Sequence, residues 1–335
     1  MAFVTLRDVA RKAGVSTAAV SQILHGKGRF SEQTRLLVQR TVEEMGYVPD
    51  RRARSMRSCE TRTVGILVPD LRNPYFADLV CSMEDELYRL GYTTLIGSSG
   101  ESVERQDAFI ENLLGQRIDG AIIVPQGVPS PGVRALAAGD TPVVFVDRRV
   151  PGMDEVPFVV SDPNPGVKNA VGELVGLGHR RIGYVAHPAL GSFSVNERRA
   201  AFEKAVAENP DDVHAVVVDC DSTYESRRGA LARLRRAGAS AVICAYSPDA
   251  LTLIGLLHDE GVEIGREMSL VSFDDISAFR LMTPDVSVVS QRPEEMGRRG
   301  VAMLLDRIAS QEPHDGRTHY VPTEFHPRRS IGPLV

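Results

Sequence analysis

The chain has 335 residues, of which 43% are hydrophobic and 25% are charged, so it is long enough for about two globular domains and too apolar to be disordered. It has no run of ~18 apolar residues, and charged side chains at positions 7, 8, 11 and 12 argue against a secretory signal. Four widely spread cysteines without a C-x-x-C pair predict reduced thiols and no metal site. We therefore expect a cytoplasmic chain without a membrane span.

Positive charge is concentrated at the amino terminus. Residues 1–62 hold twelve Lys and Arg against six Asp and Glu, whereas the rest of the chain holds 27 basic and 38 acidic side chains. A basic head on an acidic body is typical of a polyanion-binding module joined to another domain. A chance fluctuation in surface charge is the alternative, so the local motifs of the head decide between the two.

The first 45 residues have the pattern of three short helices. Thr5, Ser16 and Ser31 are each placed to cap a helix, and Gly14 supplies the left-handed residue that ends the first one. Apolar side chains at three- and four-residue spacing predict a small shared core. The predicted core residues of the third helix are Leu36, Leu37, Val38 and Val42. Two helices joined by so short a turn are typical of a helix-turn-helix, with an ordinary amphipathic hairpin as the alternative.

The second helix of this motif, residues 17–24, is expected to turn a short polar face away from the core. The residues on that face and just beyond it are Thr17, Ala18, Ser21, Gln22 and His25. A small, polar, exposed helix face in a basic module favours DNA binding over a structural hairpin.

Residues 49–57 form a short, strongly basic segment that begins with Pro49. Its basic side chains are Arg51, Arg52, Arg54 and Arg57. We expect a helix that is too small to fold alone and becomes ordered against another surface. Ala53 and Met56 are its only apolar edge, which suits insertion into a minor groove. A flexible linker is the alternative.

Residues 1–58 resemble the amino-terminal module of the lactose-repressor (LacI/GalR) family of bacterial transcriptional regulators. The matching residues are T-L-R-D-V-A-R-K-A-G-V-S-T-A-A-V-S from Thr5, then Gly46-Tyr47-x-Pro49 and Ala53-Arg54. The resemblance implies a DNA-binding repressor with a helix-turn-helix domain at 1–48 and a hinge helix and linker at 49–61. The sequence departs from the family at Met56, where leucine is usual, and at His25, where asparagine is frequent.

By the same resemblance, Thr17, Ala18 and Gln22 read bases in the major groove, and Met56 enters the minor groove. The partner would be double-stranded operator DNA. The residues that we expect to contact DNA are Thr5, Ser16, Thr17, Ala18, Ser21, Gln22, His25, Arg29, Thr34, Arg51, Ala53, Arg54 and Met56.

Beyond the head, strand-length apolar runs alternate with helical stretches. The predicted strands are 64–68, 94–96, 121–124, 143–146, 158–160, 182–185, 215–218, 241–244 and 270–273. The predicted helices lie at about 75–90, 103–116, 132–138, 165–177, 196–208, 223–237 and 248–260. Such alternation predicts two doubly wound parallel sheets, which bind ligands outside the carboxyl ends of their strands. The fold class is therefore a small all-α head on an α/β body.

Several motifs of enzyme chemistry are missing from the sequence. It contains no G-x-x-x-x-G-K-[ST] loop, no G-x-S-x-G elbow and no H-E-x-x-H pair. Gly176-x-Gly178 lacks the third spaced glycine and precedes a strand, the reverse of a dinucleotide site. We expect no enzyme activity and no cofactor, and we expect His179 to pack or cap at a helix–strand junction.

The body resembles the same family along its whole length. The matching pieces are Asn73-Pro-Tyr-Phe76, Asp119-Gly120, Val146-Asp-Arg148, Gly178-His-Arg180, Arg198, Ser272-Phe-Asp-Asp275, Thr283-Pro284 and Gln291. The resemblance implies an effector-binding and dimerisation core, 62–335, like the periplasmic sugar-binding proteins. Subdomain one would comprise about 62–161 plus 292–320, and subdomain two about 162–291 plus 321–335.

The resemblance also implies a small-molecule effector, a sugar or sugar derivative, in the cleft between the subdomains. The residues expected to bind it are Tyr75, Phe76, Asp147, Arg148, Ser194, Arg198, Tyr246, Asp274 and Gln291. A guanidinium and a carboxylate, such as those of Arg198 and Asp274, can together grip vicinal hydroxyls or a ligand carboxylate. For Arg198, a surface salt bridge is the alternative. The family often has an aromatic side chain near Ser222, and Tyr246 is placed to supply that flat face here.

The leading hypothesis is a homodimeric repressor that binds a palindromic operator and responds to an effector. The chain ends at Val335 without the extra helix of the family's tetrameric member, so we expect a dimer. A solute-binding protein of similar fold would need a signal peptide, and a sugar kinase would need a D-x-G-x-T loop. The sequence shows neither feature.

Overall fold

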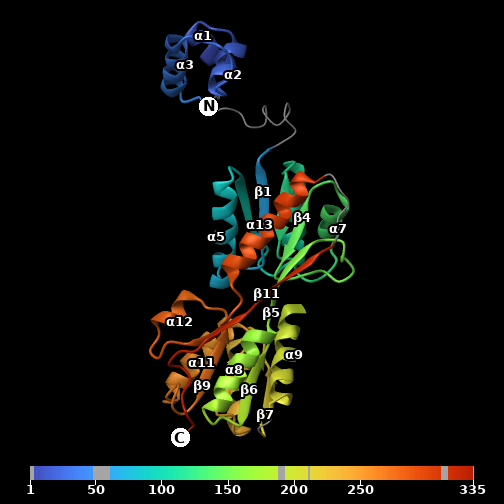
Figure 1. Ribbon diagram of the computed structural model, residues 1–335, viewed down its shortest axis with the longest axis vertical. Coiled ribbons are helices and arrows are strands. Elements are labelled where there is room, and N and C mark those ends of the chain that lie inside the picture. Colours follow the sequence, from blue (N-terminus) through green and yellow to red (C-terminus); the bar gives the residue numbers. More distant parts are fainter. Residues whose placement is uncertain (1–3, 48–60, 188–192, 210–211, 311–315, 335) are drawn as a thin grey trace. The chain divides into compact units, whose positions relative to one another are not determined.

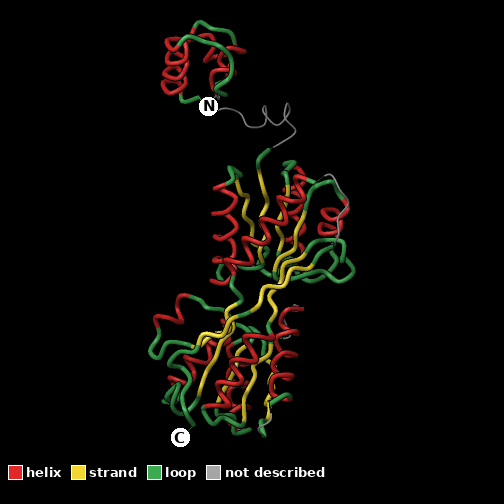
Figure 2. The backbone as a smooth tube through the Cα atoms, in the orientation of Figure 1, coloured by secondary structure: helices red, strands yellow, loops and turns green. Residues whose placement is uncertain are grey.

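The computed structural model describes residues 4–47, 61–187, 193–209, 212–310 and 316–334. The chain divides into two compact units, Met1–Thr61 and Arg62–Val335. Figure 1 and Figure 2 show the elements of each unit. Within the described residues the first unit is helical, and the second contains one parallel sheet and one sheet with a single antiparallel strand. No described helix is long and apolar enough to cross a membrane.

The described part of the first unit, residues 4–47, contains three helices whose ends are set by capping residues in the local sequence. They are α1 (Leu6–Ala13), α2 (Thr17–Leu24) and α3 (Glu32–Met45). Thr5 and Asp8 form a capping box at the start of α1, and Gly14 ends that helix with a left-handed φ of 65°. The buried core residues are Val9, Ala10, Ala13, Val20, Ile23 and Val38. The predicted helix-turn-helix is therefore confirmed.

The prediction for the inner face of α3 was partly wrong. Leu36 and Leu37 are 47% and 49% exposed, whereas Val38 is fully buried. Each residue turns a helix by about 100°, so a stripe that contains Val38 and Val42 leaves Leu36 on the opposite side. Thr41 lies on the inner face of α3 instead and is buried, and its hydroxyl donates to the Leu37 carbonyl oxygen at 2.8 Å.

Loss of the α3 cap should destabilise the first turn of that helix. The Ser31 hydroxyl oxygen accepts a hydrogen bond from the Thr34 amide at 3.2 Å. Removal of this hydrogen bond in Ser31→Ala should lower the free energy of local opening of the first turn by about 1 kcal/mol. Amide hydrogens in that turn should then exchange roughly fivefold faster. Exchange followed by mass spectrometry measures this, with exposed Gln33→Ala as the control. Equal exchange in both variants would show that the cap is not needed.

The first sheet of the second unit is entirely parallel. Its strands are β1 (Thr63–Val68), β2 (Thr93–Ser98), β3 (Gly120–Ile123), β4 (Val143–Val146), β5 (Phe158–Asp162) and β11 (Thr318–Pro322), in the order β11-β5-β4-β3-β1-β2. Its helices are α5 (Pro74–Arg89), α6 (Val103–Gly115), α7 (Pro131–Ala138) and α13 (Pro293–Ala309). α5 and α13 pack on one face, and α6 and α7 on the other.

The second sheet repeats this topology. Its strands are β6 (Arg181–Ala186), β7 (His214–Asp219), β8 (Ala241–Cys244), β9 (Ser269–Phe273), β10 (Ser287–Ser290) and β12 (Glu324–His326), in the order β12-β10-β9-β8-β6-β7. Only β12 runs antiparallel to its neighbour. Its helices are α8 (Asn164–Gly176), α9 (Phe193–Ala207), α10 (Tyr224–Arg236), α11 (Ser247–Asp259) and α12 (Ser277–Leu281). The predicted pair of doubly wound sheets is thus confirmed.

The chain passes between the sheets three times, after β5, after β10 and after β11. Hydrogen bonds tie the three crossings together. The Thr323 hydroxyl donates to the Asp162 carbonyl oxygen at 2.8 Å, and the Ser161 hydroxyl donates to the Gln291 side-chain oxygen at 2.6 Å. Because both sheets approach these crossings, the side chains at the carboxyl ends of their strands lie near one another.

Five elements after Phe273 had no counterpart among the predicted ranges. They are α12, β10, α13, β11 and β12. β10 has the sequence Ser-Val-Val-Ser, which is too short a signal to separate from a loop. β11 pairs with β5, more than a hundred residues earlier, and β12 pairs with β10, about forty residues earlier. The hydrophobic periodicity of a short segment carries no information about pairing over such distances.

Candidate functional site

The outer face of α2 is open to solvent. Thr17, Ala18 and Gln22 are exposed, as is His25, while Ser21 is half-buried. Exposed Arg29 lies in the loop that follows. The face therefore offers the Gln22 amide, the Thr17 and Ser21 hydroxyls and the methyl groups of Thr17 and Ala18. Groups of these kinds read base edges in a major groove.

Three other residues that are predicted to contact DNA also form hydrogen bonds at the starts of helices. The Thr5 hydroxyl donates to the Asp8 carboxylate, the Ser16 hydroxyl oxygen accepts from the Ala19 amide at 3.1 Å, and the Thr34 hydroxyl lies 2.7 Å from that of Ser31. These caps fix where α1, α2 and α3 begin. The remaining predicted contacts, Arg51, Ala53, Arg54 and Met56, lie outside the described residues.

A second group of polar side chains lies at the carboxyl end of the first sheet. Asn73 caps α5, which places Tyr75 and Phe76 in its buried first turn. The Tyr75 hydroxyl donates to Asp147, which directly follows β4, at 2.8 Å. Two nitrogens of buried Arg148 donate to the two carboxylate oxygens of Glu101 at 2.8 and 3.0 Å. The predicted cleft residues of subdomain one are therefore clustered.

The matching group on the second sheet comes from α9 and from the ends of β8, β9 and β10. Ser194 and Arg198 are buried on α9, one turn apart. Gln291 donates its amide hydrogen to Asp274 at 2.6 Å, and Arg198 donates Nη1–H to the Ala245 carbonyl oxygen at 2.7 Å. The Arg198 guanidinium also lies over the Phe273 ring, 4.6 Å from its centroid.

The two groups lie close enough to influence each other's ionisation. Burial raises the pKa of the Tyr75 hydroxyl, and the negative charges of Asp147 and Asp274 raise it further. Burial raises the pKa of Tyr246, at the start of α11, to about 12, with the charge of Glu101 on the opposite subdomain adding to the effect. Burial likewise raises the pKa of Asp274, against the effect of Arg198. The two sheets therefore share one polar site.

Two aspartates of this site have strained backbones at equivalent places. Asp147 follows β4 with φ 63°, and Asp274 follows β9 with φ 69°. Side chains other than glycine seldom adopt this left-handed region, although Asp does so more readily than most.

One donor of the site lacks a partner within the described part of the chain. The Nε–H of Arg198 is buried and makes no hydrogen bond to any described residue. A buried guanidinium hydrogen without an acceptor is costly, so the position is suited to an oxygen atom supplied by a ligand.

Two residues that complete the site are not among the predicted effector contacts. Glu101, which holds Arg148, and Ser247, whose hydroxyl lies 3.4 Å from an Asp274 oxygen, are not part of any motif. His179 is buried, as expected, and its ring contacts the hydroxyls of Ser240 and Ser269 at 2.8 and 2.9 Å. His179 therefore has a structural role at the amino-terminal ends of the strands of the second sheet.

Two protein-family models match the chain. Residues 5–50 match "Bacterial regulatory proteins, lacI family", and residues 171–331 match "Periplasmic binding protein-like domain". Among relatives, the HTH-type transcriptional repressor PurR of Proteus mirabilis (strain HI4320) is 29% identical over 338 residues, which cover 99% of this chain and 98% of PurR.

Solved structures with the same fold cover nearly the whole chain. The lac repressor dimer bound to operator and the anti-inducer ONPF has a TM-score of 0.83 at 24% identity, covering 99% of this chain and 100% of the repressor chain. A complex of the transcriptional regulator CelR with cellobiose has a TM-score of 0.69 at 27% identity, covering 98% of this chain and 99% of CelR.

The head, the body and these likenesses define a class of protein, a DNA-binding transcriptional regulator with a periplasmic-binding-protein-like domain. The chain carries a DNA-binding domain of the lacI family and an effector domain of the periplasmic-binding-protein type, and its relatives include transcriptional repressors. Its relatives are transcriptional regulators, in agreement with the prediction that it is not an enzyme.

Proposed function

We propose that the protein binds a palindromic operator as a homodimer, and that a neutral, hydroxyl-rich effector of the sugar class controls its affinity for DNA. The DNA contacts would come from the outer face of α2 and from the segment that follows α3. The effector would bind among the side chains of the site shared by the two sheets.

The observation that carries the effector proposal is the unpaired, buried Nε–H of Arg198. Nη1 of the same side chain is already held by the Ala245 carbonyl oxygen, so the guanidinium is fixed in orientation. A fixed donor without an acceptor favours a ligand oxygen at that point. Asp274, held by Gln291, can accept a hydroxyl hydrogen nearby.

The charge balance of the site favours hydroxyls over an anionic group. Arg148 is paired through two nitrogens with Glu101, so its charge is compensated. Asp147 lies 4.0 Å from the same Arg148, and Arg198 acts on Asp274. The two guanidinium groups therefore face three carboxylates, so the ionised groups of the site sum to a negative charge. Carboxylates accept hydrogen bonds and repel phosphates and other carboxylates. The negative balance of charge supports a neutral sugar, in line with the cellobiose in the CelR complex.

The aromatic side chains of the site support the same class of ligand. Tyr75 and Phe76 are in edge-to-face contact, with ring centroids 5.1 Å apart, on the first subdomain. Tyr246 is half-buried on the second subdomain. Flat rings with a hydroxyl can pack on the apolar face of a sugar ring and also hydrogen-bond to it.

The small size of the outer face of α2, which would contact the bases, supports the proposed homodimer. α2 has eight residues, and one such helix contacts too few base pairs for high specificity. Two copies related by a twofold axis would read two inverted half-sites.

Footprinting tests the proposal. We expect protection of two inverted half-sites by two chains, together with at least a tenfold loss of affinity when one half-site is scrambled. A panel of neutral mono- and disaccharides, added one at a time, should include one that changes operator affinity. Protection of a single half-site by one chain would contradict the dimer, and a response only to anionic metabolites would contradict the effector class.

A further inference from the structure

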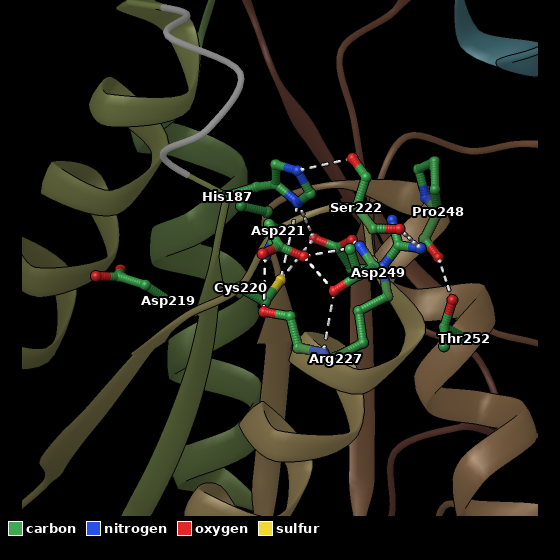
Figure 3. Close-up of polar contacts among 12 residues, drawn as sticks. His187, Asp219, Cys220, Asp221, Ser222, Arg227, Pro248, Asp249 and Thr252 are labelled. Carbon is green, nitrogen blue, oxygen red and sulfur yellow. Dashed lines mark hydrogen bonds and ion pairs between the residues drawn. The ribbon is translucent and has the colours of Figure 1, made fainter.

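A buried cluster of three different metal-ligating side chains lies in the second subdomain, apart from Arg198 and Asp274. His187 follows β6, Cys220 follows β7, and Asp249 lies in the first turn of α11, just after β8. β7, β6 and β8 are neighbours in the sheet, so their carboxyl ends bring the three residues together. All three side chains are buried, and they converge in Figure 3.

The three donor atoms form a triangle of the size that a tetrahedral metal ion requires. His187 Nδ1 lies 2.8 Å from Asp249 Oδ2, Cys220 Sγ lies 3.3 Å from the same oxygen, and Sγ lies 3.8 Å from Nδ1. Ligand bonds of ~2.0–2.3 Å at a tetrahedral angle separate such donors by roughly 3.3–3.6 Å. Shifts of about half an ångström would let all three atoms bind one ion.

The neighbours of the triangle are those that orient metal ligands. The Ser222 hydroxyl lies 3.3 Å from His187 Nε2, the ring nitrogen that faces away from the triangle. Arg227 donates Nε–H to Asp249 Oδ1, the carboxylate oxygen outside the triangle, at 2.8 Å. Partners on the far side of a ligating imidazole or carboxylate fix its orientation and tune its affinity for metal.

From this arrangement we propose that His187, Cys220 and Asp249 form a binding site for a single zinc-class divalent transition-metal ion. The combination of imidazole, thiolate and carboxylate is suited to Zn²⁺ and to Co²⁺, and it is a poor match for Mg²⁺ or Ca²⁺, which take oxygen ligands. The thiolate and the carboxylate bring two negative charges to the ion, and Arg227 shares the carboxylate through its outer oxygen.

Metal binding would replace protons that the cluster otherwise holds. Without a cation, the Cys220 thiol donates to Asp249, and burial raises the pKa of that thiol, so it stays protonated. When the ion binds, the Cys220 thiol releases its proton to solvent, and His187 takes the tautomer that carries its proton on Nε2 and leaves Nδ1 free for the ion. Nε2–H can then donate to the Ser222 hydroxyl.

The cluster touches the effector site through one aromatic contact. The His187 ring lies edge-to-face with the ring of Tyr246, at 5.1 Å between centroids and an interplanar angle of 62°. A bound ion would hold the imidazole against Tyr246. The metal proposal does not depend on the identity of the effector or on DNA binding.

Cobalt substitution tests the site in the full chain. The untagged protein is expressed in cobalt-supplemented medium, so that the buried site can fill during folding, and is then dialysed against metal-free buffer. We expect about one Co²⁺ per chain by elemental analysis and a thiolate-to-cobalt charge-transfer band in the near ultraviolet. A wild-type chain without cobalt, or with cobalt but no such band, would overturn the proposal and leave only a hydrogen-bonded network.

Variants identify which thiol binds the ion. Cys220→Ser should lose the charge-transfer band and at least nine-tenths of the cobalt, whereas Cys244→Ser, a buried control at the end of β8, and exposed Cys81→Ser should keep both. Arg227→Gln, which retains the ligands, should lower Zn²⁺ affinity by about 10- to 100-fold in competition with a chromophoric chelator. A band that survives in Cys220→Ser would overturn the assignment, even if that variant is less stable.

Discussion

Replacement of Arg198 by Ala is expected to abolish the effector response and to leave operator affinity within about twofold of wild type. The guanidinium is buried, fixed by the Ala245 carbonyl oxygen and stacked over Phe273. Its loss removes the donor proposed for the ligand and leaves Asp274 buried without a neighbouring cation. Truncation of one partner of a buried charged contact costs about 2–5 kcal/mol of ligand affinity, or roughly 30- to 4,000-fold.

Titrations of operator DNA with and without the responsive sugar measure this effect, and calorimetry measures sugar affinity directly. The control is Arg199→Ala on the next residue of α9, where the side chain is 43% exposed and paired with Glu203. We expect the control to respond as wild type does. A normal response in Arg198→Ala would move the effector away from this site, and loss of operator binding would mean that the change disturbs the whole body.

The second large effect is expected at Gln22, on the exposed face of α2. A glutamine amide can donate and accept in one plane, which matches the N6/N7 edge of adenine. Gln22→Ala should therefore cost about 1–3 kcal/mol per half-site on the operator and much less on non-specific DNA. Thr17 and Ala18 offer only a hydroxyl and methyl groups, so they should carry less of the discrimination between bases.

The measurement is a pair of titrations, on operator and on scrambled DNA of the same length. Gln39→Ala, an exposed glutamine on α3, is the matched control and should bind both DNAs as wild type does. If Gln22→Ala lost equal affinity on both DNAs, the side chain would contact only the backbone, and base reading would have to be assigned elsewhere on α2.

The sequence alone determined the features that depend on neighbouring residues. The caps at Thr5, Ser16 and Ser31 and the left-handed Gly14 define the head, because helix ends are set by groups within four residues. The strands of the body were predicted for a similar reason. A strand buried on both faces must be apolar along its whole length, and that pattern is visible without a partner.

Only the tertiary structure decided which of these residues meet. Leu36 and Leu37 have apolar side chains typical of a core, but the packing of α3 against α1 and α2 exposes both and buries Thr41, together with the predicted Val38. The elements after Phe273 depend on pairing with strands far back in the chain, so their short patterns were not distinctive. His187, Cys220 and Asp249 show the same limit most clearly. They are 33 and 29 residues apart along the chain, and the sequence therefore predicted no metal site. They meet because parallel strands end at one edge of a sheet, so residues far apart in sequence become neighbours there.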